Sequence, residues 1–139
     1  CSSCACICWD GKTMVVGSSG GGVQGKQTGA VSEAGVVGCG LYASEQMACA
    51  VTGPLDSLIT LNLASQIISD AEQDECCPER TLKLSIDNML KKSNETAGGI
   101  VLHANGCAGV YFTAPCMPYA VVKDGWIVYG FDASNRHYQ

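Results

Sequence analysis

The hydrophobic pattern divides the chain into short strand-like runs on either side of a central helical segment. Residues 4–9 and 12–17 are apolar runs separated by Asp10-Gly11, a dipeptide typical of the tight turn of a β-hairpin. After a glycine-rich stretch, residues 35–43 and 46–52 return to strand character. The first third of the chain therefore predicts four strands.

The apolar positions change to a helical period at Asp56. A wide apolar band follows, with Asp56 or Ser57 available as the N-cap, so a largely buried helix is expected. A second helix is predicted from Pro78, a favoured first-turn residue, to Lys92. Its apolar residues form one stripe, and lysines lie near its C-terminal end, where they favour the helix dipole.

Four more strands are predicted in the last third of the chain. Residues 98–104 and 108–113 are joined by Asn105-Gly106, and a hairpin at 119–131 turns at Asp124-Gly125. Strands grouped around a helix pair indicate a layered α+β domain. Because 139 residues can bury one sizeable core but not two, we expect a single domain over residues 1–139.

The amino-acid composition limits the cellular compartments and the classes of partner to be expected. With 47% apolar and 15% charged residues, much of the surface should be covered by a partner chain. No apolar run approaches the roughly 18 to 20 residues that span a bilayer, and the start of the chain lacks the basic segment and apolar stretch of a signal peptide, so we expect a cytoplasmic protein. The sequon Asn94-Glu95-Thr96 fits a lysosomal or secreted alternative. The net charge of −5, without a basic stripe, argues against nucleic acid.

The cysteines are expected to be reduced. Ten of 139 residues are cysteine, a share below the roughly 8 to 10% that marks a disulfide scaffold. Cys4, Cys6 and Cys8 share one strand face, where we expect small buried hydrophobes rather than metal ligands, because structural zinc sites usually use C-x-x-C pairs. A disulfide or redox role for Cys76-Cys77 is the alternative there.

The glycine-rich segment and the two histidines could each take part in binding or catalysis, but they form no recognisable motif. Residues 17–30 are glycine-rich, yet no G-K-[ST] and no helix follows, so a surface loop without a phosphate cofactor is predicted. His103 alternates with apolar residues on a strand and should have one face in the core. His137 lies in a polar tail. We therefore expect no cofactor, no metal and no histidine-based mechanism.

Several motifs in fixed order resemble the β-subunit of N-terminal nucleophile asparaginases. These motifs are Cys1, Ser18-Ser19-Gly20-Gly21, Gly38-Cys39-Gly40, Ala50-Val51-Thr52-Gly53 and Gly98-Gly99-Ile100. That family includes isoaspartyl peptidases and plant-type asparaginases, glycosylasparaginases and threonine aspartase. The resemblance implies a four-layer αββα sandwich in which this chain is the β-subunit half. It also implies an α-subunit cut autocatalytically from the same precursor, and a dimer of such αβ heterodimers.

The resemblance further implies an active site. Cys1 matches the N-terminal nucleophile, normally Thr, whose own α-amine can act as the base. Ser19 matches a supporting hydroxyl, and Thr52 with the Gly53 N–H matches the oxyanion site. Gly20 and Glu33 are the expected substrate-binding positions. A residue exposed merely by loss of Met remains the alternative for Cys1.

Two departures affect specificity. Where the asparaginases have Gly-Arg-Val-Gly-Asp, residues 29–33 read Gly-Ala-Val-Ser-Glu, so the arginine that clamps the substrate carboxylate is missing. Leu55 stands where the family has glycine. We therefore expect an amide or peptide hydrolase with altered specificity, acting on a small amide or peptide. The alternative is a catalytically degenerate homologue that serves as a binding or structural subunit.

Overall fold

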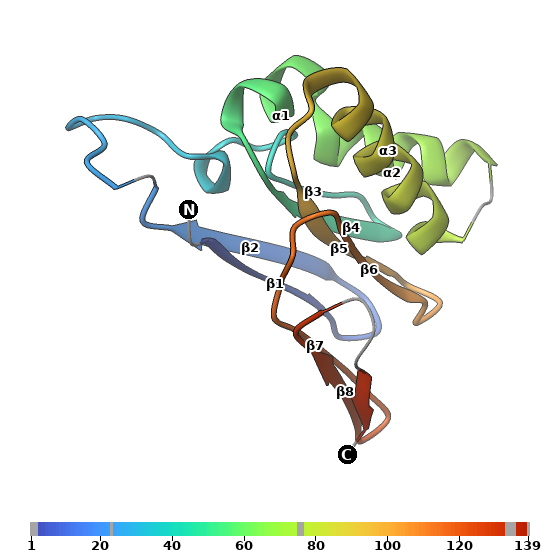
Figure 1. Cartoon of the computed structure of the whole chain (residues 1–139). Helices are drawn as coiled ribbons and strands as arrows, with labels where there is room; N and C mark the ends of the chain where they lie inside the picture. Colours follow the sequence, from blue (N-terminus) through green and yellow to red (C-terminus); the bar gives the residue numbers. More distant parts are fainter. Residues whose placement is uncertain (1–2, 23, 75–76, 133–135, 139) are drawn as a thin grey trace.

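The computed structural model describes residues 3–22, 24–74, 77–132 and 136–138 (Figure 1). The predicted first hairpin is confirmed as strands β1 (Ser3–Trp9) and β2 (Met14–Gly20). Asp10 closes its turn by accepting the backbone N–H groups of Lys12 and Thr13 at 2.8 and 2.7 Å. The expected loop at 17–30 begins later than predicted, because the pairing with β1 continues to Gly20.

A four-stranded antiparallel sheet forms the centre of the molecule. Its order is β3 (Leu41–Ala43), β4 (Met47–Thr52), β5 (Gly98–His103) and β6 (Ala108–Phe112). The strand predicted over 35–43 is mostly wrong. A short 3₁₀ helix, η1 (Glu33–Gly35), comes first, and the N–H groups of Cys39 and Gly40 then turn back onto the Val36 carbonyl. Only three residues remain to pair with β4.

Helices α1 (Leu55–Leu61), α2 (Leu63–Asp74) and α3 (Pro78–Ser93) cover one face of this sheet (Figure 1). The prediction for α3 is confirmed. The helix predicted from Asp56 begins one residue earlier, with Pro54 in the N-cap position, and it breaks at Asn62, whose φ is 46°. Residues outside the helices stabilise this break, because the backbone N–H groups in the first turn of α2 donate to the carbonyls of Gly38 and Cys39.

The main hydrophobic core lies between the helices and the central sheet. Strand β4 contributes Met47, Cys49 and Val51 to this core. The alternate residues Ala48 and Ala50, which are 0% and 2% exposed, point to the opposite face, where the β1–β2 hairpin packs (Figure 1). The described chain is therefore an α+β structure with layers of helices, central sheet and hairpin.

A separate sheet projects from the C-terminal part of the chain (Figure 1). Strands β7 (Tyr119–Lys123) and β8 (Trp126–Gly130) confirm the predicted hairpin, and β9 (Arg136–Tyr138) adds a strand where a polar tail was expected. Val122 is 70% exposed and Trp126 is 68% exposed. No described element covers this sheet as the helices and the first hairpin cover the central sheet.

The prediction that the cysteines of the first strand are buried is wrong. Cys4, Cys6 and Cys8 are exposed rather than buried, because the described chain puts no element over the outer face of β1. The Cys6 and Cys8 sulfurs lie 3.7 Å apart, and this contact, together with slight burial, raises the pKa of Cys6. The described cysteines are free thiols, and no described group of three or more potential ligands could hold a metal. The Cys76 half of the Cys76-Cys77 prediction lies outside the described residues.

No helix within the described ranges has the length and hydrophobicity needed to span a bilayer.

Candidate active site

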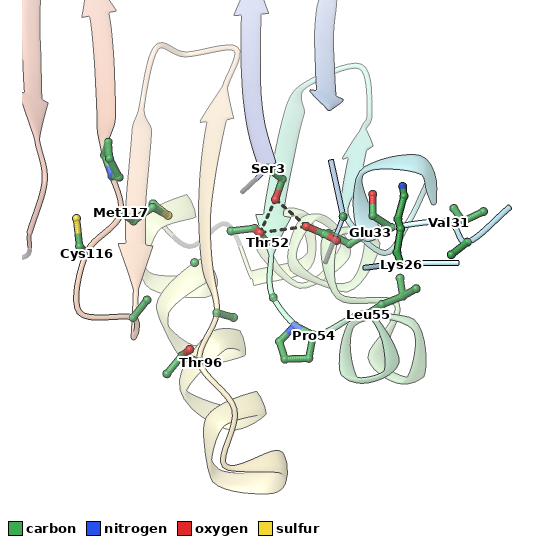
Figure 2. A pocket seen from close by; sticks show the side chains of 18 residues that line it. Ser3, Lys26, Val31, Glu33, Thr52, Pro54, Leu55, Thr96, Cys116 and Met117 are labelled. Atoms are coloured by element: carbon green, nitrogen blue, oxygen red, sulfur yellow. Dashed lines mark hydrogen bonds between the residues drawn. The ribbon is translucent and has the colours of Figure 1, made fainter. Parts of the chain in front are cut away.

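A cavity of about 830 Å³ opens where strand β4 ends (Figure 2). Thr52 and Gly53 reach it from the end of β4, and Ser3 reaches it from the start of β1. Glu33 of η1 closes one side, and residues 96–98, 114 and 116–118 line the other. Residues distant in the sequence thus meet at one hollow.

Three polar side chains form a closed set of contacts in this cavity (Figure 2). The Ser3 hydroxyl donates to Glu33 Oε1 at 2.7 Å and lies 2.7 Å from Thr52 Oγ1. Thr52 Oγ1 also donates to Glu33 Oε1, at 3.2 Å. Glu33 is only 3% exposed. Burial of a carboxyl group is costly unless it is hydrogen-bonded, so the two hydroxyls help to hold Glu33 in place.

The position of Glu33 depends on a glycine in the turn before β3. A Cβ atom at Gly40 would collide with the Glu33 carbonyl group. Because Gly40 has no side chain, η1 can lie directly against the start of β3 and direct Glu33 to the cavity. The Gly38-Cys39-Gly40 motif therefore has a structural role beside the site.

Gly53 presents a backbone donor to the same space. It lines the cavity, and within the described part of the chain no acceptor contacts its N–H. A side chain here would crowd the opposite wall, since a Cβ atom would come within 3.2 Å of the Ala97 Cβ. Gly53 thus combines an available N–H with close approach of the backbone to a ligand.

The structure brings together some of the predicted site residues but not others. Thr52, Gly53 and Glu33 converge on the cavity as described. Ser19 pairs with Cys4 and is exposed, and Gly20 pairs with Ser3; neither lines the cavity. Cys1 lies outside the described residues.

Ser3 was missed at the sequence level. A serine at the start of an apolar strand gives no signal of its own, and its partners Glu33 and Thr52 are 30 and 49 positions away. The one available clue was that Ser3 begins the strand adjoining the predicted nucleophile.

The remaining lining is mostly apolar. Ala30 and Leu55, two of the positions that depart from the asparaginase pattern, both line the cavity. Lys26 and Glu33 are the charged residues in the described lining. An apolar wall with few polar groups suits a small organic ligand whose orientation is fixed at one end.

The histidines lie elsewhere. His103 is half-buried, and its Nδ1 accepts the Asn105 N–H at 2.9 Å. His137 is exposed and stacks on Tyr129 with ring centroids 5.3 Å apart. Neither lines the cavity around Thr52.

The chain is similar in sequence to known proteins over most of its length. Residues 5–129 match the family model described as asparaginase. The chain is 32% identical over 125 residues to a probable isoaspartyl peptidase/L-asparaginase of Drosophila melanogaster, covering 89% of this chain and 38% of that protein. It is 30% identical over 120 residues to the isoaspartyl peptidase/L-asparaginase of Mus musculus, covering 86% and 36%.

A more distant relative is the plant-type L-asparaginase of Pyrococcus furiosus, 28% identical over 127 residues, with 89% of this chain and 40% of that protein covered. The chain therefore spans about two fifths of the length of these curated relatives. Since the family match extends over nearly all of its residues, the chain belongs to the asparaginase family.

Proposed function

We propose that this chain is the β-subunit half of an amide-bond hydrolase whose nucleophile is Cys1. The observation that carries the proposal is the convergence of Thr52 and Gly53 with Ser3 on one cavity. Ser3 follows the proposed nucleophile by two residues in the sequence. The relatives' names, isoaspartyl peptidase and L-asparaginase, supply the reaction type.

In the proposed reaction, the α-amine of Cys1 takes the thiol proton and the sulfur attacks the amide carbonyl carbon. Negative charge develops on the carbonyl oxygen, where the Gly53 N–H and the Thr52 hydroxyl stabilise it. The departing amine takes the proton from the α-ammonium group, and water then hydrolyses the thioester. Ser19 is the proposed supporting hydroxyl for the thiol.

The proposed substrate is a small amide or peptide without a strongly held carboxylate. Ala30 occupies the position of the family's arginine and lines the cavity with Leu55. A methyl group cannot replace a guanidinium that binds a carboxylate with two parallel hydrogen bonds. Hydrolysis of free asparagine should therefore be poor, even though Gly20 and Glu33 stay the proposed substrate-binding positions.

We also propose which chain supplies the fourth layer of the sandwich. Helices, central sheet and hairpin would be three layers of an αββα sandwich. An α-subunit released from the same precursor by cleavage before Cys1 would add the fourth. Exposed apolar residues on the outlying sheet, such as Val122 and Trp126, support a partner that buries them. We propose an assembly of two such αβ heterodimers, located in the cytoplasm.

A catalytically degenerate binding or structural subunit is the second candidate. The substitutions at Ala30 and Leu55 favour it, because both remove features that the family uses to hold its substrates.

The two candidates differ in the reactivity of Cys1. The full-length protein expressed from its gene would be treated with an acyl-type probe, digested and mapped by mass spectrometry, beside the variant Cys1→Ala. A hydrolase gives an N-terminal peptide that begins at Cys1 and carries the label, and turnover of small amides that the variant loses. An unlabelled Cys1, or amide turnover that survives Cys1→Ala, would contradict the enzyme proposal.

A further inference from the structure

The Thr52 hydroxyl carries a single hydrogen, and this chain already supplies two acceptors for it. Ser3 Oγ lies 2.7 Å from Thr52 Oγ1, and Glu33 Oε1 lies 3.2 Å from the same atom. An oxyanion donor must direct its hydrogen at the substrate's carbonyl oxygen. The three contacts therefore bear directly on whether Thr52 can donate.

Counting hydrogens limits the arrangements. Ser3 and Thr52 have one hydroxyl hydrogen each, and a Glu33 carboxylate only accepts. If Ser3 donates to Glu33, as the 2.7 Å contact indicates, the Thr52 hydrogen is directed either at Ser3 Oγ, 2.7 Å away, or at Glu33 Oε1, 3.2 Å away. If Ser3 instead donates to Thr52, the Thr52 hydrogen goes to Glu33. In both cases the Thr52 hydrogen is used within the chain.

We propose that Ser3 is a positioning residue that, with Glu33, holds the Thr52 hydroxyl in a non-donating orientation in the resting site. In this state Thr52 presents lone pairs to the cavity, and the Gly53 N–H is the available oxyanion donor. Formation of the oxyanion must draw the Thr52 hydrogen away from Ser3 or Glu33. The inference rests on the proposed function and adds a restraint on its oxyanion site.

Burial gives this restraint its strength. Glu33 is 3% exposed, so water competes little for its oxygen. Hydrogen bonds to an ionised acceptor are roughly twice as strong as those between neutral groups. The Ser3 hydroxyl is thus firmly oriented by Glu33, and it in turn orients Thr52. Among the described residues, removal of the Ser3 hydroxyl leaves the Thr52 hydroxyl with the longer contact to Glu33 alone.

The test compares two reagents on the full-length protein. 4-Nitrophenyl acetate acylates a thiol through a tetrahedral oxyanion, whereas iodoacetamide alkylates a thiol without forming one. We expect Ser3→Ala to accelerate acylation of Cys1 by about 2- to 12-fold, the factor that corresponds to the net strength of one ordinary hydrogen bond. Alkylation of Cys1 by iodoacetamide should proceed at the wild-type rate.

Two further variants test the route through Thr52. In the Thr52→Val background, Ser3→Ala should no longer accelerate acylation, because no hydroxyl remains to release. Glu33→Gln should accelerate acylation as Ser3→Ala does, since its amide can donate to the two hydroxyls and leave the Thr52 hydrogen for the substrate. 4-Nitrophenyl acetate has no ammonium group, so a role of Glu33 in binding a substrate amine does not interfere.

Ser44→Ala is the matched control. Ser44 donates to the Glu72 carboxylate at 2.5 Å, as Ser3 does to Glu33, but it lies outside the cavity, so both reactions should keep the wild-type rate. Cys1-dependent acylation that is no faster in Ser3→Ala or in Glu33→Gln would overturn the inference and leave the hydrolase proposal standing. No Cys1-dependent acylation in any variant would overturn both.

Discussion

The central sheet and the C-terminal sheet show what a covering layer does to strands of similar composition. In β4 every residue from Met47 to Val51 is buried, because helices pack on one face and the first hairpin packs on the other. In β7 and β8 the apolar residues Val122, Trp126 and Ile127 remain exposed. The described residues thus complete one core by themselves, while the C-terminal sheet keeps apolar side chains exposed among them.

The largest expected effect is the loss of a core side chain. Ile86 of α3 is fully buried against the central sheet, and Leu84 on the same helix is 52% exposed. Ile86→Ala should lower the free energy of unfolding of the full-length protein by about 2–5 kcal/mol, as large-to-small core substitutions do. Leu84→Ala is the control and should cost less than about 1 kcal/mol. Equal costs in urea denaturation would contradict the buried position of α3.

Adding one methyl group tests how tightly the central sheet is packed. A Cβ atom at Gly99 would lie 2.8 Å from Val51 Cγ1 and 3.0 Å from Leu82 Cδ1, whereas one at Gly17 of the hairpin meets nothing within 4 Å. Gly99→Ala should therefore destabilise the protein by about 1–3 kcal/mol. Gly17→Ala should stay within about 0.5 kcal/mol of wild type. Thermal or urea unfolding would measure both, and a tolerated Gly99→Ala would show a looser sheet.

Cysteine alkylation compares the buried central sheet with the exposed face of the first hairpin without a mutation. Burial raises the pKa of the Cys49 thiol far above its ordinary value, so this residue should react only when the full-length protein unfolds. Cys4 and Cys8 are exposed on the outer face of the hairpin in this chain. If the proposed α-subunit covers that face, they should react more slowly than the exposed Cys116. Native labelling with peptide mapping gives the rates, and fast reaction at Cys4 would argue against a fourth layer there.

The smallest expected effect concerns the turn of the first hairpin. The backbone N–H groups of Thr13 and Lys12 hold the pKa of Asp10 below its ordinary value. Its stabilising contribution is therefore fully present above the ordinary aspartate pKa and is lost as the pH falls through the lowered value. Asp10→Asn should weaken the acid dependence of the unfolding midpoint slightly in this range. An unchanged acid dependence would mean that these hydrogen bonds do not persist in solution.

Local signals explain which parts of the fold could be predicted. Asp-Gly and Asn-Gly dipeptides predict the turns of the hairpins, and Pro78 predicts the start of α3. These elements could therefore be predicted from short stretches of sequence. The break at Asn62 does not, because it depends on distant packing. A Cβ at Gly38 would come within 2.5 Å of Asn62 Oδ1, so the turn at Gly38 and the helix break fit against each other.

The residues of the candidate site likewise divide into those that a local motif predicts and those that only the fold brings together. Thr52 and Gly53 were predicted because they lie in a short motif whose spacing resembles the asparaginases. The role of Ser3 could not be predicted, since it arises from contacts with Glu33 and Thr52 that exist only after η1, β1 and β4 have packed together. Short motifs thus pointed to Thr52 and Gly53, which line the cavity, while the contacts of the Thr52 hydroxyl required the fold.

The most direct test of the central claim is a crystal structure of the mature full-length protein, with the distances from Cys1 Sγ measured. Cys1 should be the first residue of its chain, with Sγ opening into the cavity that Thr52 and Gly53 line. Its sulfur should lie within roughly 3 to 4 Å of the Ser19 hydroxyl, the range expected of an unliganded catalytic pair. A Cys1 that is disulfide-bonded, or whose sulfur lies more than about 8 Å from both the Ser19 and Thr52 hydroxyls, beyond any hydrogen bond, would contradict the claim.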